Sequence, residues 1–267
     1  PKMRERPEEV KINYSSPLYN GLVFVGIAST VGSGKFFDIG PFKYSAPLSN
    51  IDVSQFWQWD PFLRRITMQF DGVDDYVRIP NVGALSSISA VSAFAWAMPQ
   101  IVMTSRHRPI DGPDNKAFQL YYSTPRWVFS VNDGSSNKPV YYSHSPQPWT
   151  WYAISGRGTV GLSEFWLNGV SRVQRTDVSN LAGFTGYISL GTHSATKDAI
   201  SQFWNGRVAD ALVWKRLVSD YEIQSLSDPA NVDLRIGGIP LILPPRRRYW
   251  PVVSEQAVPK MVPWHLF

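Results

Sequence analysis

The stretch "MQFDGVDDYVRIPN", residues 68–81, places three aspartates and a glycine between apolar residues. Gly72 can take a positive φ, and the side chain of Asp71 can accept hydrogen bonds from backbone N–H groups of a tight turn. Tyr76, Val77 and Ile79 then continue as a core strand. Three interpretations of this acidic turn stay open: a structural turn, a metal site, or a pair of catalytic carboxylates.

The rest of the chain predicts many short strands and very little helix. The 267 residues include 11 Trp, 12 Tyr, 14 Phe, 21 Pro and 19 Gly, which favours strands with frequent turns. The Asn168-Gly169 pair in "SEFWLNGVSRV" fits a type I′ hairpin turn. Ser219 and Glu222 form a capping box that predicts one short helix near 220–226. Further strands are expected within 90–99, 127–143, 186–191 and 206–214, and residues 36–62 are expected to be packed loops with short strands.

The acidic turn and four later motifs resemble, in the same order, the laminin-G-like/pentraxin-like (concanavalin-type) β-sandwich family. The later motifs are "VSAFAWAMP", "WTWYAISG", "EFWLNGV" and "FWNGRVADALVWKRLVSDYEIQSL", and the resemblance covers about residues 18–227. It implies an all-β fold, a two-sheet antiparallel jelly-roll sandwich with one short helix and extended terminal arms. The expected division is an N-terminal arm over 1–17, the sandwich over 18–235 and a C-terminal docking arm over 236–267.

The composition changes after Asp233. Residues 236–267 contain six prolines, three consecutive arginines and two tryptophans. Proline density forbids a regular helix or a central strand, and the apolar content is too high for an ordinary disordered tail. We therefore expect an arm that docks on a partner. Its predicted contact residues are the basic Arg246, Arg247 and Arg248 and the aromatic anchors Trp250, Trp264 and Phe267.

A second resemblance concerns the two ends of the chain. The lead-in "PLYNGLV" and the ending "SDPANVDLRIGGIPLILPPRRRYW" resemble laminin-G-like proteins carried by tailed bacteriophages. This implies a non-enzymatic virion protein, decorating the capsid or associated with the tail, that docks on a major capsid or tail protein and forms a homo-oligomer. The expected location is the surface of the phage particle, after synthesis in the host cytoplasm without a signal peptide. The alternative is a carbohydrate-binding adhesion module that recognises a host-surface glycan.

Composition narrows the remaining classes of partner. No apolar run reaches the roughly 20 residues of a membrane span, so no membrane is expected. The net charge is +5, but residues 13–235 are nearly neutral and show no basic stripe, so no specific nucleic acid is expected. The absence of cysteine excludes disulfides and thiolate metal sites.

Calcium is the one cofactor that the resemblance implies. Family members often bind Ca²⁺ through the first aspartate of the acidic turn and a carboxylate from a strand that here reads "GRVAD", 206–210. Ala209 replaces the first aspartate of that strand, which leaves Asp210 as the nearby carboxylate. The candidate ligands are therefore Asp71, Asp74, Asp75 and Asp210, all of them oxygen donors of the kind that Ca²⁺ prefers.

A polysaccharide-active enzyme is the third functional hypothesis. Sandwich glycosidases place two carboxylates across a cleft, and none of the six glutamates lies in the alternating run that would do so. No HExxH, GxSxG or P-loop pattern occurs, so the chain is expected not to be an enzyme. Aromatic side chains could stack on a sugar, and because adjacent tyrosines on a strand face opposite sides, at most one of each pair enters the core. The candidate ligand-binding residues are Trp57, Trp59, Tyr121 and Tyr142.

Overall fold

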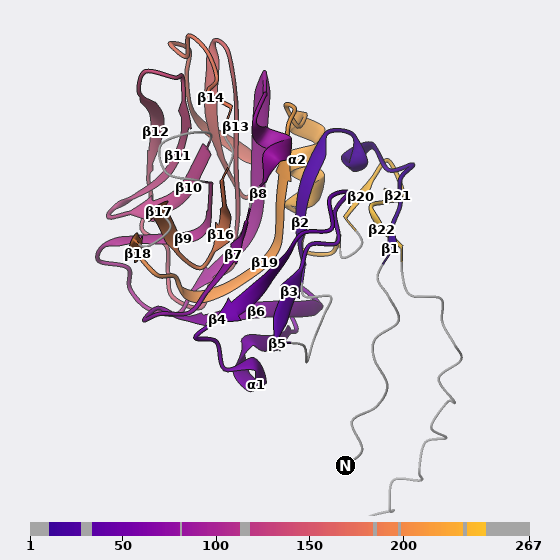
Figure 1. The fold of residues 1–267 in the computed structure, drawn as a ribbon, viewed down its shortest axis with the longest axis vertical. Helices are drawn as coiled ribbons and strands as arrows, with labels where there is room; N and C mark the ends of the chain where they lie inside the picture. The colour runs from indigo at the N-terminus through magenta and orange to yellow at the C-terminus, as the bar shows by residue number, and fades with distance from the viewer. Residues whose placement is uncertain are drawn as a thin grey trace, which may run out of the picture.

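The computed structural model describes residues 11–27, 34–80, 82–112, 118–183, 186–196, 199–231 and 234–243. Two eight-stranded antiparallel sheets stack face to face (Figure 1). The first sheet has the order β12 (Asn137–Ser143), β11 (Arg126–Asn132), β10 (Phe118–Ser123), β9 (Arg106–Asp111), β16 (Ile188–Leu190), β7 (Tyr76–Ile79), β4 (Ser45–Ser49) and β3 (Lys35–Phe37). The second has the order β15 (Val170–Arg175), β14 (Leu162–Leu167), β13 (Tyr152–Thr159), β8 (Ala90–Pro99), β19 (Asn205–Trp214), β6 (Arg65–Asp71) and β5 (Trp57–Asp60), with β2 (Leu22–Gly26) also paired to β19.

Shorter elements complete the described chain. Three two-stranded ladders join β1 (Lys11–Ile12) to β22 (Ile242–Leu243), β17 (His193–Thr196) to β18 (Ala199–Ser201), and β20 (Arg235–Ile236) to β21 (Ile239–Pro240). The helices are α1 (Val53–Phe56) and α2 (Asp220–Leu226), with 3₁₀ turns η1 (Pro17–Tyr19) and η2 (Gly83–Leu85). The predicted two-sheet antiparallel sandwich is confirmed. Neither helix in the described ranges is long and apolar enough to cross a membrane.

The main core lies between the two sheets. Alternate residues of β11, Trp127, Phe129 and Val131, point into it and are almost completely buried. The sheets approach closely at β13, where a Cβ placed on Gly156 would lie 2.0 Å from Cδ2 of Phe129. A Cβ on Gly158 would lie 2.5 Å from Cγ1 of Val131. The glycines of β13 therefore make room for the side chains of β11.

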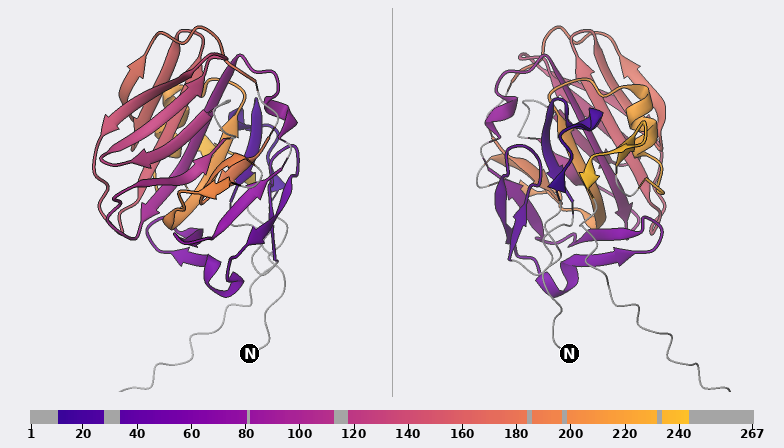
Figure 2. Two further views of the ribbon diagram at one scale, coloured as in Figure 1. Left: turned by 60° about the vertical axis from the view of Figure 1, so that its left-hand side comes forward. Right: turned by 90° about the vertical axis from the view of Figure 1, so that its right-hand side faces the viewer.

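A second apolar cluster covers the other face of the second sheet. Trp96, Leu212 and Trp214 contribute from the sheet, and α2 and the segments near both ends of the described chain pack over them (Figure 2). The indole N–H of Trp214 donates to the carbonyl of Leu18 at 2.7 Å. Leu241 is also fully buried in this cluster, so the described fold continues past residue 235, the expected end of the sandwich.

The sequence predicts one of the two helices and misses the other. The α2 helix has the predicted capping box, in which Ser219 accepts from the N–H of Glu222 and Glu222 accepts in return from the N–H of Ser219 at 2.8 Å. The α1 helix is a single turn inside 36–62, where loops with short strands were expected. Its start is set by Asp52, whose carboxylate accepts from the N–H of Ser54 at 2.9 Å.

Candidate functional site

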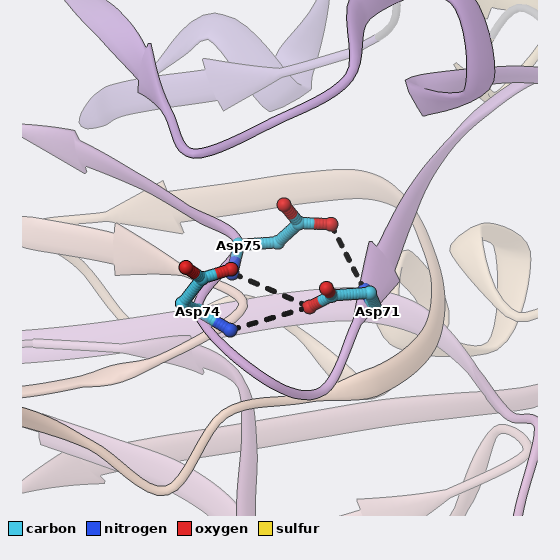
Figure 3. A group of neighbouring side chains, drawn as sticks. All are labelled: Asp71, Asp74 and Asp75. Atoms are coloured by element: carbon cyan, nitrogen blue, oxygen red, sulfur yellow. Dashed lines mark hydrogen bonds between the residues drawn. The ribbon is translucent and has the colours of Figure 1, made fainter.

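The acidic turn joins β6 to β7 and is organised by its own hydrogen bonds (Figure 3). The carboxylate of Asp71 accepts from the backbone N–H groups of Val73, Asp74 and Asp75 at 2.8, 3.3 and 3.4 Å. Asp75 accepts in return from the N–H of Asp71 at 3.0 Å. Gly72 has a φ of +80°, as the turn requires. The side chains of Asp71 and Asp75 therefore fix the turn.

Three carboxylates meet there. One oxygen from each of Asp71, Asp74 and Asp75 lies within 4.8 Å of the others. Burial, and then repulsion from Asp71, Asp74 and Asp52, raise the pKa of Asp75 to about 6 against the hydrogen bond that lowers it. A hard cation that prefers oxygen ligands fits this donor set. The turn also borders a cavity of about 310 Å³ lined by Asn50, Asp52, Gln55, Phe56, Gln58, Gln69, Asp71 and Asp75.

The fourth candidate ligand, Asp210, is not brought to this turn, which corrects the expectation that it shares an ion with Asp71. Asp210 is buried and forms an ion pair with Arg65, at the opposite end of β6 from Asp71. The residue of β19 that pairs with Asp71 is Asn205, whose amide donates to the Asp71 carbonyl at 2.7 Å. Five residues along a strand correspond to about 16 Å, too far for a shared ion.

A second cavity, of about 320 Å³, lies on the face of the first sheet that points away from the core. Its floor follows the strand register. Gln119, Ser130 and Pro139 form one row across β10, β11 and β12. Tyr121, Val128 and Tyr141 form the next row. The lining residues are Arg106, Arg108, Gln119, Tyr121, Ser130, Asn137, Pro139, Tyr141 and His193.

A buried ionic network borders this cavity. Asp111, at the end of β9, is fully buried and accepts from Nη1 of Arg108 at 2.8 Å. Its other oxygen lies 2.7 Å from Nδ1 of His193, the first residue of β17, which lies beside β9 (Figure 1). The guanidinium of Arg108 also donates to Gln202 at 2.8 Å and covers the ring of Tyr121, with its central carbon 4.4 Å from the ring centroid. The network holds three side chains of the cavity wall in place.

Two groups on the wall stand out for their hydrogen bonding. Gln119 as a residue is only 6% exposed, but it lines the cavity, and its amide is not one of the fully enclosed side-chain groups that lack a partner. The amide is therefore open to water or to a ligand in the cavity. Burial raises the pKa of the Tyr121 phenol above its usual value, against the lowering effect of Arg108 and Arg106, so this tyrosine is a neutral hydroxyl at neutral pH.

The structure separates the four predicted ligand-binding aromatics. Tyr121 lines the second cavity, but Tyr142 packs toward the core, and its neighbour Tyr141 takes the place beside Tyr121. This corrects the choice of Tyr142 and agrees with the rule that adjacent tyrosines face opposite sides. Trp57 packs against the core and Trp59 is exposed on β5, in the other sheet.

Sequence reasoning missed the polar part of this wall. Gln119 could have been found from "FQLYYS", 118–123, because it alternates in phase with Tyr121 and out of phase with the apolar Phe118 and Leu120. Arg106, Arg108 and His193 carry no such signal, because they come from other strands. The predicted docking residues, Arg246, Arg247, Arg248, Trp250, Trp264 and Phe267, lie outside the described residues.

The acidic turn is also where a known family begins to match. The model of the concanavalin A-like lectin/glucanases superfamily matches residues 71–224, from Asp71 into α2. The chain belongs to that superfamily. Its members share the two-sheet sandwich described above, and the match spans strands of both sheets, including all those that line the second cavity. No curated protein sequence matches the chain.

Solved structures of this concanavalin-like fold include binding domains of botulinum neurotoxins. The binding domain of botulinum neurotoxin DC in complex with rat synaptotagmin II is 12% identical, with a TM-score of 0.59 over 79% of this chain and 52% of that one. A structure of botulinum neurotoxin type C, whose access to cells is dependent upon interaction with two ganglioside molecules, is 12% identical with a TM-score of 0.60 over 79% and 51%. The chain spans about half the length of these structures, and the likeness establishes the fold.

Proposed function

We propose that this chain is a non-catalytic carbohydrate-binding domain whose saccharide site is the second cavity, on the outer face of the first sheet. The observation that carries the proposal is the amide of Gln119, which opens onto the cavity beside the tyrosine row. A saccharide presents hydroxyl groups that both donate and accept, so it can bond to the oxygen and to the N–H groups of this amide. Few other ligands carry as many hydroxyl groups on a molecule of this size.

The tyrosine row supplies the second requirement for a sugar. Tyr141 is 49% exposed, and the central carbon of Arg126 lies 5.5 Å from its ring centroid, whereas Tyr121 is only 7% exposed and Arg108 lies closer over its ring, at 4.4 Å. Aromatic faces carry partial negative charge, and the C–H groups on one face of a sugar ring carry partial positive charge. Tyr141 therefore provides the platform, and His193, held by Asp111, presents its imidazole to the same cavity.

Binding without catalysis fits the composition of the cavity wall. Glycoside hydrolysis uses two carboxyl groups on opposite sides of the scissile bond. The described residues of the wall include no aspartate or glutamate, and the adjacent Asp111 is fully buried and bonded to Arg108 and His193. The superfamily and the neurotoxin binding domains that share the fold also support a binding role.

A glycan array probed with the purified chain tests the proposal. Tyr141→Ala removes the exposed platform and should reduce the signal of every bound glycan at least tenfold. Tyr221→Ala is the matched control, because Tyr221 is a similarly exposed tyrosine on α2 and does not line the cavity. An unchanged signal for Tyr141→Ala, or no binding to any glycan, would reject this site or this function.

Display on a phage particle is a second proposal, carried by the resemblance of the chain ends and by the composition of residues 236–267. In that case the sandwich is the displayed body, and the stretch beyond Leu243 docks it on a capsid or tail protein. Deletion of 244–267 leaves all described elements intact and should abolish incorporation into particles. Normal incorporation of the shortened chain would assign docking to another part of the molecule.

A further inference from the structure

We infer that the saccharide bound in the second cavity carries an anionic group, a carboxylate or a sulfate; this inference rests on the carbohydrate-binding function proposed above. It comes from the charges on the wall and from two arginines, Arg106 and Arg126, that flank β10 at the same level. Neither feature is needed to bind a neutral sugar.

Among the described residues, the wall of the cavity carries two arginines and no carboxylate. Arg106, Arg108 and His193 line it, and its nine lining residues include no aspartate or glutamate. The nearby Asp111 is already shared between Arg108 and His193, at 2.8 and 2.7 Å. That carboxylate offsets the charge of Arg108, and no carboxylate of the described residues forms an ion pair with Arg106.

Strand register adds a second uncompensated arginine. Ser123 on β10 pairs with Arg106 of β9 on one side and with Arg126 of β11 on the other. The two arginines are therefore two strand spacings apart, or about 10 Å. Both are exposed, and neither forms an ion pair with any described residue. Two like charges at this distance repel each other, and an anion placed between them removes that repulsion.

The two arginines also point to where the anion lies relative to the sugar. The central carbon of Arg106 is 6.0 Å from the ring centroid of Tyr121, and that of Arg126 is 5.5 Å from the ring centroid of Tyr141. The arginine row, the tyrosine row and the row of Gln119 follow one another along the strands at intervals of two residues, about 7 Å. A sugar on Tyr141 can thus present hydroxyl groups toward Gln119 and an acidic substituent toward the arginines.

Guanidinium groups suit this ligand chemically. The planar fork of an arginine donates two parallel hydrogen bonds to a carboxylate or to another oxyanion, which a single ammonium group cannot do. Because both arginines are solvent-exposed, their attraction for an anion weakens as salt is added. An acidic glycan should therefore bind with an affinity that falls with ionic strength, whereas a neutral glycan should not.

Matched pairs of glycans test this inference. Chondroitin sulfate is compared with its desulfated form and with its carboxyl-reduced form, and sialylated oligosaccharides are compared with the same oligosaccharides after sialidase treatment. Poly-glutamate serves as an anionic probe without sugar. We expect at least one acidic glycan to bind ten times or more tighter than its neutralised twin, and poly-glutamate not to bind. The pair that shows the difference identifies the carboxylate or the sulfate as the recognised group.

Variants connect the result to the two arginines. Arg106→Gln and Arg126→Gln should each weaken the acidic glycan about tenfold, which corresponds to about 1.4 kcal/mol, and leave the neutral twin unchanged. Arg64→Gln is the control, because Arg64 is an exposed arginine in the turn after β5 of the other sheet. If an acidic glycan and its neutral form bind equally, and both need Tyr141, the proposed function still holds but the inference is wrong. Equal binding of poly-glutamate would also overturn it, and no glycan binding at all would end both.

Discussion

The two cavities have similar volumes, about 310 and 320 Å³, but their walls carry charges of opposite sign. In the described part of the chain, the one at the acidic turn is lined by three aspartates and no basic residue, and the one on the outer face of the first sheet by two arginines and a histidine but no acidic residue. The first is built largely from one continuous stretch of chain, whereas the second is assembled from five strands. A substitution in the acidic turn should therefore affect that turn alone. The basic cavity depends instead on the pairing of its strands and on the buried ionic network of Arg108, Asp111 and His193.

The largest expected effect is the loss of stability when the buried ionic network is broken. Asp111→Ala removes the carboxylate shared by Arg108 and His193 and leaves buried charge uncompensated, which should lower the free energy of unfolding by about 3–5 kcal/mol. Asp71→Ala, at the exposed turn, should cost only about 1 kcal/mol through its lost hydrogen bonds. Urea denaturation of both variants measures the difference. Similar losses for the two variants would contradict the distinction between the cavities.

The next largest expected effect is the stabilisation of the fold by calcium, which should act at the acidic turn only. If Ca²⁺ binds the three aspartates, as the sequence resemblance implies, a hundredfold excess over Kd should stabilise the fold by about 2.7 kcal/mol, and EDTA should reverse this. Asp74→Asn should abolish the response, because it removes a carboxylate that makes no side-chain hydrogen bond within the described turn. Asp228→Asn, at an exposed aspartate beyond α2, should respond like the wild type. If neither Ca²⁺ nor EDTA changes the melting temperature, the acidic turn has only its structural role.

A third test sharpens the picture of the basic cavity. Gln119→Leu should weaken glycan binding about tenfold, or about 1.4 kcal/mol, because the hydrogen-bonding amide is lost. The same substitution should leave the melting temperature nearly unchanged, since the amide opens onto the cavity and makes no side-chain hydrogen bond with the described residues. Isothermal titration and thermal melting measure the two effects. A variant that loses stability as well would show that the amide supports the fold rather than the ligand.

The smallest expected effect concerns pH at the acidic turn. The pKa of Asp75 is raised to about 6 in the fold, above the ordinary value of 3.8, so the folded state binds the proton more tightly than the unfolded state. The contribution of Asp75 to stability is therefore most favourable below pH 4 and declines as pH rises to about 6. Asp75→Asn should remove this decline, measured as the difference between the two melting temperatures across pH 4–7. Burial of Asp75 is the main cause of the raised pKa, and the repulsion from the exposed Asp71 and Asp74 adds less because solvent screens it.

The sequence predicted the features that are local and missed those that depend on strand register. The acidic turn, the capping box of α2 and the Asn168-Gly169 hairpin each lie within a few residues, and each is present. Asp210 was wrongly placed beside Asp71, because residues of β19 meet β6 five positions earlier than the resemblance suggested. Tyr142 was chosen over Tyr141 although Val140, in phase with Tyr142, already indicates which face of β12 is apolar. The gathering of Arg106, Gln119, Tyr141 and His193 follows from the order β12-β11-β10-β9 and the position of β17, which no motif encodes.

The glycines of β13 have a consequence for the basic cavity on the far side of the first sheet. Phe129 and Val131 of β11 are pressed against the backbone at Gly156 and Gly158, and between them Ser130 of the same strand faces the cavity. A strand clamped from behind cannot bend toward a ligand, so the floor of the cavity keeps its shape before the ligand arrives. Little conformational entropy is then lost on binding, and selectivity comes from how well a ligand fits a fixed surface rather than from the surface adapting to the ligand.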